Sequence, residues 1–136
     1  MDEVRGSRDE VRGVAVEVRS YRDLTVWKKS MDLAADVYRL TRHMPKQEEY
    51  RIISQMIRAS TSIPANIAEG HGRGTRKDYA HFISIARGSL FELETFVLLV
   101  QHLEIGDPQH CARILDKTDE VSRMLNVLRT RLSARP

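Results

Sequence analysis

Residues 76–103 read RKDYAHFISIARGSLFELETFVLLVQHL, and this stretch decides the fold. Its apolar residues recur at steps of four and three, which places them on one face of a helix. The members of this seam are Tyr79, Ile83, Ala86, Leu90, Leu93, Val97 and Val100. At about 1.5 Å of rise per residue, such a helix forms a rod roughly 40 Å long. We therefore expect a long amphipathic helix over residues 76–104.

The residues on either side of this stretch are helix-ending and helix-starting signals. Thr75 is a side-chain cap for the long helix, and three glycines before it end the preceding helix. After the stretch, residues 106–108 (GDP) supply a turn, a cap and a first-turn proline. A fourth helix is expected over 108–133, with a seam of Cys111, Ile114, Thr118, Val121, Leu125, Leu128 and Leu132.

Two further helices precede the glycines. Apolar residues at helical spacing predict the first helix over about 23–43, with Asp23 as its cap and Pro45 just beyond its end. The second is expected over 47–70, with a kink at Pro64, because proline lacks the amide proton that the helix needs. Hydroxyl groups just before Pro64 can bond to freed carbonyls.

These four segments, with short connections and no alternating strand pattern, predict an all-α fold. The expected architecture is an antiparallel up-down-up-down four-helix bundle over residues 21–134. Several helix faces carry more apolar residues than one seam needs, which favours a homo-oligomer over a monomer.

The first twenty residues differ from the rest of the chain. They repeat a short motif (DEVRG, DEVRG, VEVRS) at a seven-residue period. One valine per period, with glycine inside the repeat, makes too narrow a stripe for a coiled coil. We interpret residues 1–20 as a flexible, disordered tail outside the bundle.

Length and composition limit the classes of protein that fit. A chain of 136 residues makes one domain, and its only cysteine, Cys111, can neither form an internal disulfide nor share a zinc site with a second cysteine. The apolar runs are far shorter than the roughly 20 residues that cross a membrane. We expect a cytoplasmic protein with no membrane partner. The net charge of +3 permits a polyanionic partner without requiring one.

The sequence gives little support for a catalytic or a metal-binding site. Helical bundles often bind di-iron centres through Glu-x-x-His motifs, but the nearest match is a single Asp-x-x-His at residues 78–81. His43, His71, His102 and His110 all lie near predicted helix ends, where solvated or capping roles are usual. Cys111 follows His110 directly, so the two side chains point apart on a helix. We therefore expect no enzyme activity, no cofactor and no metal.

Basic residues form two groups. Arg73, Arg76 and Lys77 lie at the start of the long helix, whose free amides favour an anion, and Arg87 follows farther along. Arg123, Arg129 and Arg131 lie near the chain's end, where positions 121–136 contain no acidic residue. These residues are candidates for binding nucleic acid, RNA before DNA. The alternative is that they are a solvated helix terminus and a frayed end.

Two polar features of the helix interiors are predicted to be structural. Asn66 and Glu69 share a helix face, and with Arg58 or Arg87 they could form a buried polar cluster. Gly88 lies in the middle of the long helix, where glycine costs about 1 kcal/mol relative to alanine. We expect another helix backbone to approach closely there.

Several ordered motifs resemble one known family. They are residues 23–29 (DLTVWKK), 55–59 (QMIRA), 62–70 (SIPANIAEG), 79–82 (YAHF) and 86–94 (ARGSLFELE). Together they are similar to the four-helix-bundle family named after the 23S rRNA intervening sequence, over roughly residues 21–130. The chain departs from the family pattern at Met44, where an aromatic residue usually precedes the proline, and at Arg51, where a glycine is common. It also departs at residues 102–105, which replace the usual end of the third helix.

The resemblance implies a bacterial, cytoplasmic bundle that assembles as a homopentamer. Family members are often encoded within or near ribosomal RNA genes. Related, Avd-like bundles are accessory proteins of the reverse transcriptases of diversity-generating retroelements. Two readings follow: an oligomer that binds nucleic acid through basic surfaces, or a protein-interaction scaffold such as a reverse transcriptase subunit. A metalloenzyme is the third and weakest.

Overall fold

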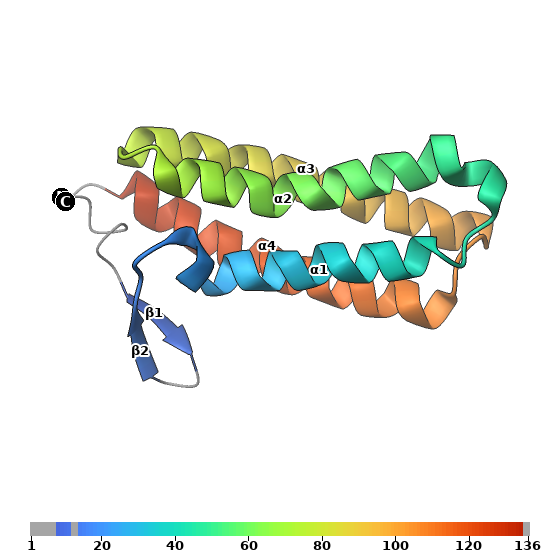
Figure 1. The fold of residues 1–136 in the computed structure, drawn as a ribbon, viewed down its shortest axis with the longest axis horizontal. Coiled ribbons are helices and arrows are strands. Elements are labelled where there is room, and N and C mark those ends of the chain that lie inside the picture. Colours follow the sequence, from blue (N-terminus) through green and yellow to red (C-terminus); the bar gives the residue numbers. More distant parts are fainter. Residues whose placement is uncertain (1–7, 12–13, 135–136) are drawn as a thin grey trace.

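Four helices packed lengthwise dominate the computed structural model, which describes residues 8–11 and 14–134 (Figure 1). They are α1 (Thr25–Thr41), α2 (Ser54–Gly72), α3 (Arg76–Leu103) and α4 (Pro108–Ser133). Successive helices run in opposite directions, and α1 and α3 each pack against both α2 and α4. Helices α1 and α3 therefore occupy opposite corners of the bundle. The prediction of an all-α, up-down-up-down four-helix bundle is confirmed.

Within the segment expected to be a flexible tail, the structure contains a short hairpin. Strands β1 (Arg8–Val11) and β2 (Val14–Glu17) pair antiparallel, with Val11 opposite Val14. The sequence repeat did not predict this pairing. The remainder of the tail up to residue 13 lies outside the described residues, and Val18, just after β2, is buried in the core.

The sequence predicted that Asp23 caps α1, but this residue caps the turn that precedes the helix. The carboxylate of Asp23 accepts hydrogen bonds from the amides of Arg19 and Ser20, so it closes the 3₁₀ turn η1 (Tyr21–Asp23). These amide donors hold the pKa of Asp23 below its ordinary value. Leu24 occupies the cap position of α1 and makes no side-chain bond there.

The backbone break in the second helical segment lies before α2. A 3₁₀ turn, η2 (Lys46–Glu48), and a π-helical turn, η3 (Glu49–Ile53), precede the helix, and Arg51 has non-helical dihedral angles (φ −113°, ψ −109°). By contrast, α2 runs as one helix through Pro64. Hydroxyls of Ser60 and Thr61 bond to carbonyls three and four residues back, just before the proline.

The core consists largely of the seams expected from the sequence. All seven residues of the α3 seam are buried, and so are those of the α4 seam except Leu128, which is partly buried. Asp107 caps α4 by accepting from the Gln109 amide, with Pro108 in the first turn. Because each seam lies on one stripe of its helix, the four seams meet along the bundle axis.

Close helix approach occurs at Gly70, and not at Gly88 as predicted. A Cβ atom on Gly70 would lie 2.8 Å from the Cβ of Phe82 and 3.3 Å from the Tyr79 carbonyl oxygen. The space beside Gly88 holds no atom within 4 Å, because this residue lies on the outer face of α3. The cost of a glycine in mid-helix is therefore not offset by packing within the subunit.

Candidate nucleic-acid interface

Five residues of the two basic groups found in the sequence lie at one end of the bundle. The turn between α2 and α3 lies at the same end as the last turn of α4 (Figure 1). The guanidinium of Arg76 joins them: it donates to the carbonyl of Ala134 at 3.1 Å, to that of Leu132 at 3.5 Å, and to that of Arg131. The side chain of Arg76 therefore completes the end of α4, whose last carbonyls have no partner within the helix.

Three basic side chains at this end are exposed and make no ion pair with a described residue. They are Lys77, Arg129 and Arg131. The start of α3 lies beside them, where Thr75 accepts from the Asp78 amide and the aligned peptide dipoles add partial positive charge. We call Lys77, Arg129 and Arg131, together with Arg73 and Arg76, the basic end.

The remaining predicted basic residues are engaged locally or lie elsewhere. Arg73 pairs with Glu69 at 3.2 Å and lies over the Phe82 ring. Arg123 pairs with Asp119 one turn away on α4. Arg87 lies over the Phe91 ring, about 16 Å along α3 from its start. The structure therefore gathers five of the seven predicted residues and leaves Arg87 and Arg123 apart.

The polar cluster predicted from Arg58, Asn66 and Glu69 does not form. Arg58 and Glu69 are exposed, and Glu69 pairs with Arg73 instead. Asn66 donates to the carbonyl and the hydroxyl of Ser62, and that hydroxyl lies 2.8 Å from the hydroxyl of Ser89 on α3. Asn66 and Glu69 share a helix face, as predicted, but Glu69 lies where this face borders solvent.

A buried charge cluster that sequence reasoning missed links α1 and α4. The carboxylate of Asp36 lies 2.9 Å from Nε2 of His110, accepts a hydrogen bond from Lys117 at 3.0 Å, and lies 3.6 Å from Arg39. Burial by itself would raise the pKa of Asp36, but the hydrogen bonds and charges of Lys117 and His110 outweigh it and hold the pKa below its ordinary value. His110 was expected to be solvated and is buried instead.

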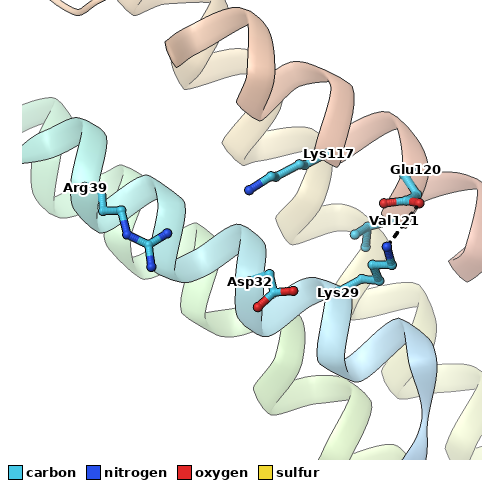
Figure 2. Close-up of a pocket in the computed structure, with 6 residues that line it drawn as sticks. All are labelled: Lys29, Asp32, Arg39, Lys117, Glu120 and Val121. Carbon is cyan, nitrogen blue, oxygen red and sulfur yellow. Dashed lines mark ion pairs between the residues drawn. The ribbon is translucent and has the colours of Figure 1, made fainter.

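This cluster borders a shallow groove between the same two helices. Figure 2 shows Lys29, Asp32 and Arg39 on α1 facing Lys117, Glu120 and Val121 on α4, with Lys29 paired to Glu120 at 3.5 Å. Cations and carboxylates alternate across the groove. Its three cations and two carboxylates leave an excess of only one positive charge with which to attract a nucleic acid.

The described residues offer neither a reactive thiol nor a metal-binding cluster. Cys111 is buried in the core, and this burial, aided by the charge of Asp107, raises the pKa of its thiol. Within residues 8–11 and 14–134, no group of three or more His, Cys, Asp or Glu side chains could hold a metal ion.

Comparison with known proteins agrees with the four-helix fold. The model of the family described as 23S rRNA-intervening sequence protein matches residues 22–127, which cover α1, α2, α3 and most of α4. The chain belongs to this family. A crystal structure of a protein of unknown function from Bacteroides thetaiotaomicron, assigned to the S23 ribosomal protein family, is similar to this intervening-sequence protein at 26% identity with a TM-score of 0.71. The match covers 76% of this chain and 96% of that one. No curated protein matches.

None of the described helices is both long enough and apolar enough to span a membrane.

Proposed function

We propose that this intervening-sequence protein is a non-enzymatic, oligomeric bundle that binds nucleic acid, RNA before DNA, through its basic end. The observation that carries the proposal is the contact of Arg76 with the end of α4. It places the start of α3, where Lys77 lies, at the same end of the bundle as the last turns of α4, which carry Arg129 and Arg131. Phosphates neutralise such side chains and release counterions, which drives binding without sequence preference. The family name, which refers to ribosomal RNA, favours RNA.

Oligomerisation is the second half of the proposal. Large apolar side chains are exposed on α1 and α3, among them Met31, Tyr38, Phe91 and Leu98. Their burial between subunits stabilises an assembly, for which the family resemblance implies five copies. An assembly repeats the basic end and so raises the affinity for a long polyanion. The proposed compartment is the bacterial cytoplasm, where ribosomal RNA lies.

A gel shift at low salt tests the nucleic-acid half. The probes are a labelled RNA hairpin, a single-stranded RNA and a DNA of equal length. Changing Lys77, Arg129 and Arg131 together to Glu should weaken binding strongly, so that the shift needs more protein or less salt. If single-stranded RNA loses three phosphate contacts, the slope of log K against log salt should fall by about 2.

The matched control reverses three charges at the opposite end of the bundle. Arg42, Lys46 and Arg113 are exposed there and make no ion pair with a described residue. Their change to Glu alters the net charge by the same amount. Equal loss in both triple variants would mean that net charge, and not the basic end, governs binding.

A protein-interaction scaffold is the second candidate function, with a reverse transcriptase of the retroelement type as its partner. Exposed Leu99 and Leu103 on α3, 41% and 52% accessible, favour it. Changing both to Ser should weaken capture of a purified reverse transcriptase while leaving the RNA gel shift unchanged. Loss of the shift alone would argue against the scaffold.

A further inference from the structure

An aromatic pair lies where the chain enters α1. The rings of Tyr21, in η1, and Trp27, in the first turn of α1, meet edge to face with their centroids 5.2 Å apart. The guanidinium of Arg22 lies over the Tyr21 ring, 5.6 Å from its centroid. Both rings pack against the core and are only partly buried, so each keeps some surface open to solvent. We call Tyr21 and Trp27 the aromatic pair.

The aromatic pair lies at the same end of the bundle as the basic end (Figure 1). Helices α1 and α3 run in the same direction, because one antiparallel helix separates them in the chain, so both start at this end. The turn η1 contacts α2 as well as α1, and α2 finishes in the turn that leads to α3. Axes of neighbouring helices lie about 8–10 Å apart, so the diagonal from α1 to α3 is roughly 13 Å. A strand of a few nucleotides can cover both places.

Cations without ion pairs surround the aromatic pair. Arg19, Arg22 and Lys28 are exposed, and none of them makes an ion pair with a described residue. Asp23 is the only acidic residue between positions 18 and 31, and its carboxylate accepts from the amides of Arg19 and Ser20. Three cations against one carboxylate leave a positive surplus here, which attracts phosphate.

We infer that the aromatic pair binds an unpaired nucleobase, so that the nucleic acid recognised at this end is single-stranded. The inference rests on the proposed function and specifies its substrate class. Aromatic rings and guanidinium planes stack on any base, which adds affinity without sequence preference. Arg19 and Lys28 contact the phosphates beside that base. The bases of a duplex are stacked on one another and do not reach the rings, so a duplex is bound through its phosphates alone.

The fluorescence of Trp27 reports on the aromatic pair directly, because the chain contains one tryptophan. Titration with a short oligouridylate at low salt should quench this fluorescence, with the same midpoint as the gel shift. Two probes that carry the same phosphates are the controls: an abasic strand of equal length and an RNA duplex. Both should bind and leave the fluorescence unchanged. Equal quenching by the abasic strand would show that charge, and not a base, acts on Trp27, and would overturn the inference.

Substitution of the other ring tests the stacking without relying on fluorescence. Tyr21→Leu keeps an apolar side chain against the core and removes the ring, so the affinity for single-stranded RNA should fall about tenfold. The affinity for the duplex should stay the same. Tyr50→Leu is the matched control, because Tyr50 is 89% exposed and lies in η3, at the opposite end of the bundle. Circular dichroism and urea unfolding verify that both variants are folded.

The outcomes separate this inference from the proposed function. Absence of a gel shift with every probe would overturn the proposed function, and the inference with it. A shift of single-stranded RNA that leaves Trp27 fluorescence unchanged would overturn the inference alone. Equal affinity of wild type and Tyr21→Leu for single-stranded RNA would do the same, and so would an equal loss in Tyr50→Leu. In these cases the basic end would still account for binding.

Discussion

The α2–α3 seam and the α1–α4 seam hold the same bundle together by different physics. Along α2–α3, the backbones approach closely at Gly70, and the serine pair Ser62–Ser89 adds one short hydrogen bond. Along α1–α4, the buried carboxylate of Asp36 is surrounded by His110 and Lys117. The first seam tolerates no added volume, and the second tolerates no lost charge. Each can therefore be weakened by a change that is harmless in the other.

The largest effect is expected from added volume at the α2–α3 seam. Gly70→Val would force its side chain against Phe82 and the Tyr79 backbone, which costs about 3 kcal/mol of unfolding free energy. Urea unfolding followed by circular dichroism measures the change. Gly72→Val is the matched control. Gly72 lies in the same helical turn as Gly70, but a Cβ atom added there would have no neighbour within 4 Å. Equal losses at both positions would mean that close packing is not the cause.

Removal of the buried carboxylate should weaken the α1–α4 seam by a smaller amount. Asp36→Asn leaves His110 and Lys117 without their anion, at a cost of about 2 kcal/mol. The cost stays below that of a fully buried pair because the Lys117 side chain is 40% exposed and can turn to water. Asp32→Asn, one turn away and exposed, should change stability by less than about 0.5 kcal/mol. A loss from Asp32→Asn as large as that from Asp36→Asn would contradict the role of burial.

Lowering the pH should weaken the α1–α4 seam by protonating Asp36, whereas the α2–α3 seam contains no such group. The pKa of Asp36 is lower in the folded protein than its ordinary value of 3.8, so the unfolded chain binds the proton more readily. The stability that Asp36 supplies is complete above its ordinary pKa and is lost as the pH falls through its lowered folded value. The gap between wild type and Asp36→Asn, measured by urea unfolding from pH 6 to pH 2.5, should narrow below about pH 4. A gap that stays constant over this range would show that the carboxylate's charge is irrelevant.

The smallest effect belongs to the ion pair at the surface of the α1–α4 seam. Lys29 and Glu120 lie 3.5 Å apart, and each is 44% exposed. Their double-mutant cycle to Ala should give a coupling below about 0.5 kcal/mol that disappears at 1 M salt. A larger or salt-resistant coupling would mean that the groove shields the pair from solvent.

Sequence patterns correctly predicted the features that depend on a single helix, such as its buried face and its cap. The seam of α3 is buried from Tyr79 to Val100, and Thr75 caps the helix as expected. Partners across helices were harder to foresee. His110 and Asp36 are 74 residues apart, and no spacing rule connects them. Arg76 was predicted to meet phosphate, yet it donates to the carbonyls that end α4.

By itself, the sequence determined that this chain makes four amphipathic helices and closely fixed the bounds of α3 and α4, because periodicity and capping act over a few residues. Only the tertiary structure decided which faces meet. Packing in three dimensions placed Gly70 in contact and Gly88 in the open, buried Asp36 among cations, and joined Arg76 at the start of α3 to the end of α4. Such outcomes depend on the rotation of each helix about its own axis, which is fixed by all its neighbours together.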